Sequence, residues 1–308
     1  MKKLVCIIAF LGLVFNLVAQ SQGQFTGALL WKISGQDLKK PSYILGTHHA
    51  VDVSFLDSIP GVIQALMQVK QVAGEVDLTD MESTGSIALK YSLMPKEYSY
   101  KSLLSEKDYN LLDKALSEQI GMGMSQLQAL HPATINTLLV QMICSKLFPE
   151  FQNPNFEPID SYIQKLALNK KKSVIGLETI EEQFELLYNS ASIEDQVKSL
   201  LCVVRYPEES FDGLAEITGF YRQKQLDKLY EFYQKSSEIL DSDDECQTEP
   251  FSMEGLNKER NDKWLKTLPQ IMKEKSTLVV VGAMHIAGEE GLLYKLAKMG
   301  YTVEAVRE

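Results

Sequence analysis

Two short motifs of the form G-x-x-H, at opposite ends of the chain, place histidines where a reaction site could form. The motif GTHH follows the strand-like run Ser42–Leu45 and ends at His49, and GAMH follows the apolar run Thr277–Val281 and ends at His285. In α/β sheets, ligands bind at the carboxyl ends of the strands. Glycine before each histidine lets the backbone turn sharply and leaves room for a ligand close to the main chain. We therefore predict that the two motifs are two halves of one site.

Two acidic side chains also stand at the ends of strand-like runs. Glu75 comes near the end of QVAGEVD, and Glu178 follows SVIGL. Two imidazoles with a carboxylate are a common ligand set for a catalytic divalent metal that keeps one coordination position open. Such an ion polarises a carbonyl group and lowers the pKa of a bound water. The spacing is not H-E-x-x-H, so these ligands would come from strands far apart in the sequence. The predicted metal ligands are His49, His285 and Glu75.

Simpler roles are open to the same residues. A histidine after a strand is often a turn or hydrogen-bonding residue, and Glu75 alone would be a carboxylate on a strand surface. His48 stands beside His49 and could face the site in its place. His131, which precedes a proline, is predicted to cap a helix or to pack. Arg260, within KERND, would by default pair with a neighbour at i+4 for little energy. The repeated G-x-x-H context favours the functional interpretation of the two motifs.

Composition and net charge limit the classes of protein to which this chain can belong. The chain has 308 residues, is 45% hydrophobic and 23% charged, and carries a formal net charge of −10. This balance is typical of a globular protein with one large or two small domains. The acidic surplus argues against a nucleic acid or an anionic membrane as partner.

The N-terminus has the pattern of a signal peptide. The basic start MKK is followed by the apolar run Leu4–Val18 and by the small residue Ala19. This run is too short and wrongly flanked for a transmembrane anchor. We predict that residues 1–19 are a signal peptide, that the mature chain is exported to the periplasm or secreted, and that it has no membrane partner after cleavage.

Three cysteines remain after the predicted cleavage, and export permits a disulfide among them. Pairing cannot be deduced from the sequence. Cys144 lies in an apolar helical run and is predicted to be a buried thiol, and the pairing of Cys202 with Cys246 stays open. The acidic segment 241–245 lacks the spacing of an EF-hand, so calcium is not predicted there.

Strand-like segments lie toward both ends of the chain, and helical spacing fills the middle. Strands are predicted at Leu29–Ile33, Ser42–Leu45, Gln71–Asp77, Ser173–Leu177, Thr277–Val281 and Tyr301–Val306. A helix before the last strand is predicted to stop at Gly300. Residues 181–198, 221–240 and 257–273 are predicted to be helical, with a break at Pro207 and the Gly213–Gly219 region. We predict one domain over residues 20–308. Its fold class is α/β, with a mixed central sheet of N- and C-terminal strands and a large helical insertion or cap at about 101–270.

With these residues in view, the chain resembles the TraB/GumN family, which includes the TIKI metalloproteases. The resemblance runs from about Leu30 to Val306. It rests on SYILGTHH, GEVDL, SVIGLETIEEQ, LNKERNDKW and VVVGAMHIAGEEG in this order. It implies a fold related to the erythromycin-esterase and ChaN-like proteins. In the TIKI branch it implies a metal-dependent peptidase that uses manganese or cobalt, with zinc as a further candidate. The TraB branch is linked to the shutdown of peptide pheromones, where binding is an alternative to cleavage.

The resemblance also assigns positions. The family motifs map to His49, His285, Glu75, Glu178, Gln183, Glu259, Arg260 and Asn261. His48 stands at a spacer position that is usually apolar in the family, so either histidine could face the site.

We therefore expect an exported metal-dependent hydrolase, a peptidase that acts on a peptide or protein. Glu178 or Glu75 would be the general base, and Arg260 would stabilise the developing oxyanion. His48 and Asn261 would bind the substrate. Two alternatives remain: a non-catalytic peptide-binding protein on the same scaffold, and a metal-free, esterase-like hydrolase with a histidine base.

Overall fold

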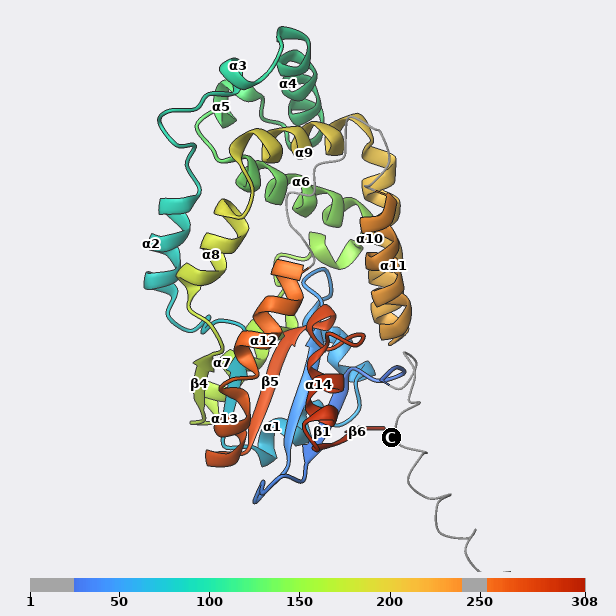
Figure 1. Ribbon diagram of the computed structural model, residues 1–308. Helices are drawn as coiled ribbons and strands as arrows, with labels where there is room; N and C mark the ends of the chain where they lie inside the picture. The colour runs from blue at the N-terminus through green and yellow to red at the C-terminus, as the bar shows by residue number, and fades with distance from the viewer. Residues whose placement is uncertain (1–24, 240–253, 308) are drawn as a thin grey trace, which may run out of the picture.

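The computed structural model describes residues 25–239 and 254–307, which form a sheet region below a helical cap (Figure 1). The predicted signal peptide, Cys246 and the acidic segment 241–245 lie outside the described residues. Within the described ranges, no helix is both long and apolar enough to cross a membrane.

A six-stranded mixed sheet forms the lower part of the molecule, in the order β4-β3-β5-β2-β1-β6. The strands are β1 (Leu30–Ser34), β2 (Ser42–Thr47), β3 (Gln71–Gly74), β4 (Ser173–Gly176), β5 (Thr277–Gly282) and β6 (Thr302–Ala305). Strands β4, β3, β5 and β2 are parallel to one another, and β1 pairs antiparallel with both β2 and β6. The N- and C-terminal strands therefore share one sheet, as predicted.

The central strands β2 and β5 carry the two G-x-x-H motifs side by side. All six residues of β2 are buried, as are the first five of β5, which explains their nearly continuous apolar sequence. Their register pairs Gly46 with Val281 and Thr47 with Gly282. Both motifs thus leave the sheet at neighbouring points of one edge.

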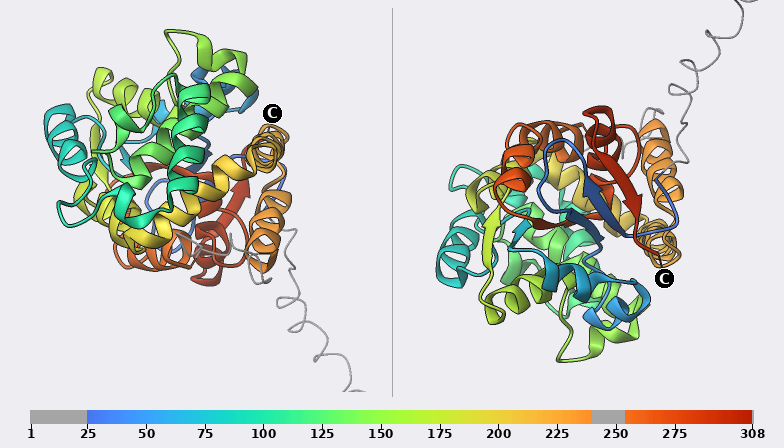
Figure 2. Two further views of the ribbon diagram at one scale, coloured as in Figure 1. Left: turned by 90° about the horizontal axis from the view of Figure 1, so that it is seen from above. Right: turned by 90° about the horizontal axis from the view of Figure 1, so that it is seen from below.

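Helices cover both faces of the sheet (Figure 2). One face carries α1 (Val62–Gln68) and α7 (Ile159–Asn169), and the other carries α13 (Leu268–Glu274) and α14 (Leu292–Lys298). Gly300 follows the C-cap of α14 with φ +90°, a left-handed conformation that glycine adopts without a Cβ penalty, so the predicted helix end is confirmed.

The cap is helical and has a hydrophobic core of its own, which includes Leu112, Ile135 and Leu200. Its α-helices are α2 (Met81–Tyr91), α3 (Tyr100–Leu103), α4 (Glu106–Ile120), α5 (Met124–Leu127), α6 (Pro132–Leu147), α8 (Ile180–Asn189), α9 (Ile193–Arg205), α10 (Pro207–Arg222) and α11 (Leu226–Ile239). Short 3-10 helices lie at η1 (Val53–Ser58) and η2 (Pro149–Gln152). The chain enters the cap at α2, returns to the sheet region for α7 and β4, and then completes the cap.

Two predicted helical segments are helical but divided, and one predicted break was wrong. The predicted helix at 181–198 is split into α8 and α9, because the Ser192 hydroxyl accepts from the Asp195 N–H and starts a new helix. The predicted break at Pro207 and the Gly213–Gly219 region is instead the continuous helix α10. Pro207 occupies its first turn, where the missing N–H removes no intrahelical hydrogen bond. The predicted helix at 257–273 is divided into a π-helical turn η3 (Glu254–Glu259), α12 (Arg260–Trp264) and α13.

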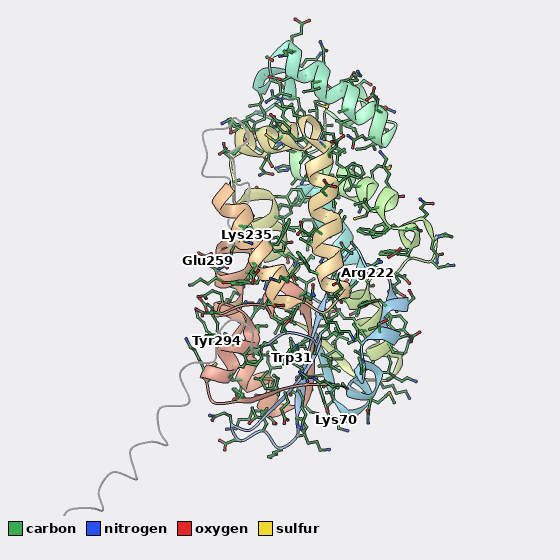
Figure 3. The ribbon with its side chains drawn as sticks, turned by 90° about the vertical axis from the view of Figure 1, so that its right-hand side faces the viewer. Trp31, Lys70, Arg222, Lys235, Glu259 and Tyr294 are labelled. Atoms are coloured by element: carbon green, nitrogen blue, oxygen red, sulfur yellow. The ribbon has the colours of Figure 1, made fainter. Side chains whose placement is uncertain are left out.

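Helix α10 runs from the cap down to Arg222 at the upper edge of the sheet region, and α11 returns beside it toward the cap (Figure 1 and Figure 3). Gly288, in the loop after β5, packs directly against Tyr230 of α11: a Cβ at this glycine would lie 2.4 Å from the tyrosine ring. The cap therefore contacts the same sheet edge at which the G-x-x-H motifs end.

The two cysteines within the described ranges differ in state. Cys144 is a free, buried thiol, as predicted, and burial raises its pKa to about 11. Cys202 is disulfide-bonded.

Candidate functional site

The four predicted strand-end side chains start from one edge of the sheet, because β2, β3, β4 and β5 are parallel. Glu75 directly follows β3, and Glu178 lies two residues beyond β4, where its N–H donates to the Glu75 carbonyl at 2.9 Å. His285 ends the 3-10 turn η4 (Ala283–His285) after β5, and His49 lies two residues beyond β2.

A cavity of about 310 Å³ opens at this edge. Its polar lining includes His48, His49, Glu75, Arg260 and His285. Its apolar lining is formed by Leu229, Tyr233, Leu256 and Met284. A smaller pocket of about 90 Å³ shares His49 and Glu75 with this cavity and adds Asp160 and Gln183.

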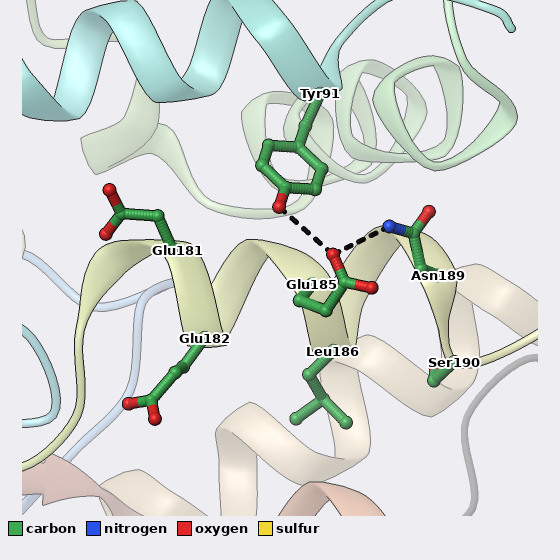
Figure 4. Close-up of a pocket in the computed structure, with 7 residues that line it drawn as sticks. All are labelled: Tyr91, Glu181, Glu182, Glu185, Leu186, Asn189 and Ser190. Atoms are coloured by element: carbon green, nitrogen blue, oxygen red, sulfur yellow. Dashed lines mark hydrogen bonds between the residues drawn. The ribbon is translucent and has the colours of Figure 1, made fainter.

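A larger, open hollow of about 570 Å³ lies between α2 and α8 (Figure 4). There Glu185 accepts hydrogen bonds from the Tyr91 hydroxyl at 3.0 Å and the Asn189 amide at 2.8 Å. None of the predicted site residues lines this hollow, so the candidate site is the smaller cavity at the strand ends.

Arg260 occupies the centre of the site and connects three strand ends. Its Nη2 donates to Glu75 Oε2 at 2.6 Å and to Glu178 Oε1 at 2.6 Å. Its Nε donates to both oxygens of Glu178, and its Nη1 donates to the Leu256 carbonyl at 3.2 Å and contacts His285 Nε2 at 2.9 Å. A guanidinium has five N–H donors, and each of these has a partner within the chain.

Glu75 is held ionised despite its burial. Burial alone would raise the pKa of this carboxyl, but attraction from His285 and Arg260 and the Gly282 N–H, which donates to Oε1 at 2.7 Å, outweigh it and lower the pKa to about 2. His285 is charged only in acid, so Arg260 and the Gly282 amide hold the carboxylate at neutral pH.

His285 is neutral at physiological pH. Burial is the largest cause and lowers its pKa to about 4, and Arg260 acts in the same direction, whereas Glu75 opposes them. The imidazole ring packs on Trp264 at a centroid distance of 4.5 Å. With Glu75 and Glu178 as carboxylates and one guanidinium between them, this part of the site has a net charge of −1, which favours an additional cation.

The adjacent histidines of the first motif face different surroundings. His48 Nδ1 accepts from the Ala50 N–H at 3.1 Å, its Nε2 contacts the Thr218 hydroxyl at 3.3 Å, and its ring packs edge-on against Tyr221. Burial lowers its pKa to about 4. His49 is largely exposed, with 75% of its side chain accessible, and its Nδ1 lies 3.5 Å from Asp160 Oδ2. His48 thus joins the first motif to α10, while His49 lies at the junction of the two pockets.

Trp264 and Gln183 belong to the same network. The Trp264 N–H donates to Glu178 Oε2 at 3.3 Å, and the Arg260 guanidinium lies over the indole ring at 4.8 Å. Gln183 Nε2 donates to Glu75 at 3.3 Å and to Glu178 at 3.4 Å. Gln183 was among the family positions mapped from the sequence, but no role was predicted for Trp264. The available signal was its position four residues after Arg260, which puts both side chains on one side of a helix.

The two motif glycines differ: Gly282 lines the cavity, as expected, whereas Gly46 packs against the protein and lines no part of it. A Cβ at Gly46 would lie 2.6 Å from Ile286 Cδ1, and one at Gly282 would lie 3.3 Å from Glu75 Oε1. The space beside Gly46 is therefore filled by the Ile286 side chain, and Gly282 allows the close approach of Glu75. Gly282 also has an ordinary φ of −54°, so its role is close packing, not a left-handed turn.

Comparison with known families shows which family the chain belongs to. The model of the TraB/PrgY/gumN family matches residues 29–305, which span all six strands and both G-x-x-H motifs. The chain belongs to the TraB/PrgY/gumN family. No curated protein and no solved structure matched it. Membership agrees with the resemblance drawn from the motifs.

A divalent ion fits part of the predicted ligand set. In this family member, His285 Nε2 and Glu75 Oε1 lie 3.7 Å apart. Two ligand atoms each about 2.1 Å from one ion are about 3 to 4 Å apart, so these two atoms could share an ion. Among the residues that the structure describes, however, no group of three or more His, Cys, Asp or Glu side chains is arranged to hold a metal. His49 faces Asp160, and an ion on His285 would have to replace the Arg260 Nη1 contact.

Proposed function

We propose that this protein is a hydrolase that cleaves peptide bonds at the strand-end cavity. The observation that carries the proposal is a hydrogen-bonded network in which Glu75, Arg260 and His285 line that cavity and Glu178 holds Arg260 from behind. Buried ionisable groups with strongly shifted pKa values concentrate at functional sites. A cavity lined by both polar groups and apolar side chains suits a peptide segment, whose backbone is polar and whose side chains can be apolar.

We further propose a divalent ion, with manganese or cobalt favoured, as the cofactor. His285 and Glu75 would hold it, and His49 would be the third ligand. Neither predicted general base is placed to activate water alone. Glu178 lies behind Arg260 with a side chain only 3% exposed, and Glu75 has a pKa of about 2, far below the value near working pH that favours proton transfer. A bound divalent ion would supply this activation and polarise the scissile carbonyl.

The remaining residues of the network would then position these ligands. Glu178, Gln183 and Trp264 hold the guanidinium of Arg260, and Arg260 holds Glu75. The Nη1–H that now contacts His285 Nε2 is the donor that becomes free when this nitrogen takes another partner. We assign to it the stabilisation of negative charge on the substrate oxygen.

The test combines metal analysis with peptide cleavage. Purified protein is stripped with a chelator, reloaded with manganese, cobalt or zinc, and incubated with a peptide library. We expect one bound ion per chain and cleavage that depends on it, both lost in His285→Ala and retained in His131→Asn, which changes a histidine outside the site. A stripped protein that cleaves at the full rate would favour the metal-free hydrolase, and a wild type that neither binds metal nor cleaves would refute the proposal.

Peptide binding without cleavage is the second candidate. It is favoured by one observation: every N–H of Arg260 already has a partner, so the site as described offers no spare donor of Arg260 to an oxyanion. The discriminating result is tight peptide binding that survives the double replacement His49→Ala, Glu75→Ala, together with no turnover by the wild type.

We also propose that the protein is exported. The leader-like N-terminus and the disulfide at Cys202 support this, because disulfides persist in oxidising compartments. N-terminal sequencing of the protein recovered outside the cytoplasm should find a chain that begins near Gln20. Recovery of only the uncleaved chain in the cytoplasm would contradict the proposal.

A further inference from the structure

Asn261 is completely buried directly behind His285. Its Nδ2 donates to two main-chain carbonyls, those of Glu290 at 2.8 Å and His285 at 3.2 Å. Its Oδ1 lies 2.9 Å from His285 Nδ1. Carbonyl oxygens only accept hydrogen bonds, so the two carbonyls determine which end of the amide carries the NH2 group. Oδ1 must then face the imidazole.

This orientation determines the tautomer of His285. An amide oxygen accepts but cannot donate, so Nδ1 must carry the proton. In a neutral imidazole the other nitrogen then has the lone pair. The opposite side of the ring agrees, because Arg260 Nη1, which can only donate, lies 2.9 Å from Nε2. Two independent contacts thus place the lone pair on the nitrogen that lies toward Arg260 and Glu75.

We propose that Asn261 is a positioning residue that holds His285 in the Nδ1–H tautomer, with the Nε2 lone pair directed at the reaction site. The inference deepens the proposed function, since a lone pair on Nε2 is what either metal binding or proton acceptance requires. It differs from the substrate-binding role predicted from the sequence, because Asn261 is fully buried. Arg260 and Asn261 are consecutive in α12, so one side chain points into the network and the next passes behind the imidazole.

Two substitutions separate the tautomer from the packing. Asn261→Leu keeps the approximate volume but removes the acceptor, so the proton is free to move to Nε2. Asn261→Asp keeps an acceptor for Nδ1–H and should keep the tautomer, although it loses both donors. We expect turnover of Asn261→Leu to fall about 10- to 100-fold, the usual effect of losing a partner that orients a ligand. The loss should appear in kcat, with KM little changed.

The direct readout is nitrogen NMR of the full-length protein with labelled histidine, recorded at pH 8, where the imidazole is neutral. The chain has only four histidines, and His285→Gln assigns the signal. Wild type and Asn261→Asp should show a protonated Nδ1 and an unprotonated Nε2. Asn261→Leu should show a mixture or the reverse. The measurement needs neither metal nor substrate.

Gln196→Ala is the matched control. Gln196 is a buried amide in the cap whose Nε2 also donates to two main-chain carbonyls, those of Tyr188 and Ala191. Its loss should lower stability but leave the His285 signal and turnover unchanged. A wild-type His285 protonated on Nε2 would overturn the inference, as would Asn261→Leu with an unchanged tautomer. Absence of turnover in the wild type would instead contradict the proposed function, and the NMR result would still decide the tautomer.

Discussion

Replacing Arg260 with methionine would leave two buried carboxylates without the cation that binds them. The exposed fractions of the three side chains are 12% for Arg260, 17% for Glu75 and 3% for Glu178, so water can replace the lost partner only in part. Breaking a buried pair by removing one member typically costs about 3 to 5 kcal/mol of unfolding free energy. We expect a loss in this range for Arg260→Met at pH 7.5.

The pH dependence of the free energy of unfolding gives a sharper test, because Glu75 should stabilise wild type at neutral pH but destabilise Arg260→Met there. In the native protein the pKa of Glu75 is lowered from 4.5 to about 2. This contributes roughly 3 kcal/mol, which is present above pH 4.5 and is lost as the pH falls toward 2. Without Arg260, burial dominates and raises the pKa of Glu75 above its ordinary value. The penalty of the variant should therefore be largest at neutral pH and shrink as the carboxylate becomes protonated.

The assay is urea unfolding of wild type and Arg260→Met at pH 7.5 and pH 5.5, followed by circular dichroism. Lys32→Met is the control, because it removes a pair with Glu304 whose side chains are 39% and 54% exposed and should cost at most about 1 kcal/mol at either pH. Adding Glu178→Gln to Arg260→Met should restore part of the lost stability. The reasoning fails if Arg260→Met costs less than about 1 kcal/mol, or if its penalty does not decrease at pH 5.5.

Three further predictions concern other parts of the molecule. Burial lowers the pKa of His131 from 6.5 to about 4. The neutral imidazole therefore contributes fully to the free energy of unfolding above pH 6.5, and this contribution is lost as the pH falls toward 4. Between pH 7.5 and 5.5, the free energy of unfolding in urea should fall by about 1 kcal/mol less in His131→Asn than in wild type. Gly288→Ala should cost about 1 to 3 kcal/mol, because φ is +70° and the new Cβ meets the Tyr230 ring, whereas Gly219→Ala in α10 should be neutral or stabilising in the same assay. Trp264→Phe should cost about 1 to 3 kcal/mol through the lost N–H donor to a carboxylate, and a cost equal to that of a surface substitution would contradict the assigned contact.

The sequence alone determined the elements of the sheet and the identity of the edge that carries the site. A strand-like run predicted β2 and an apolar run predicted β5, and the glycine turns after them marked where the chain leaves the sheet. Parallel strands end at a common edge, so His49, Glu75, Glu178 and His285 could be expected together without any coordinates. The pattern failed where local signals were ambiguous. Pro207 predicted a break, but a proline also fits the first turn of a helix.

Only the tertiary structure decided which partner each side chain takes. The sequence left open whether His48 or His49 faces the site, and in the structure α10 lies beside the first and Asp160 beside the second. Arg260 would pair with a helix neighbour if its helix were isolated, but the fold brings Glu75 and Glu178 to it from strands β3 and β4. Hydrogen bonds and ion pairs depend on distances between segments remote in the chain. Periodicity reports which face of an element is buried and carries no information on what that face meets.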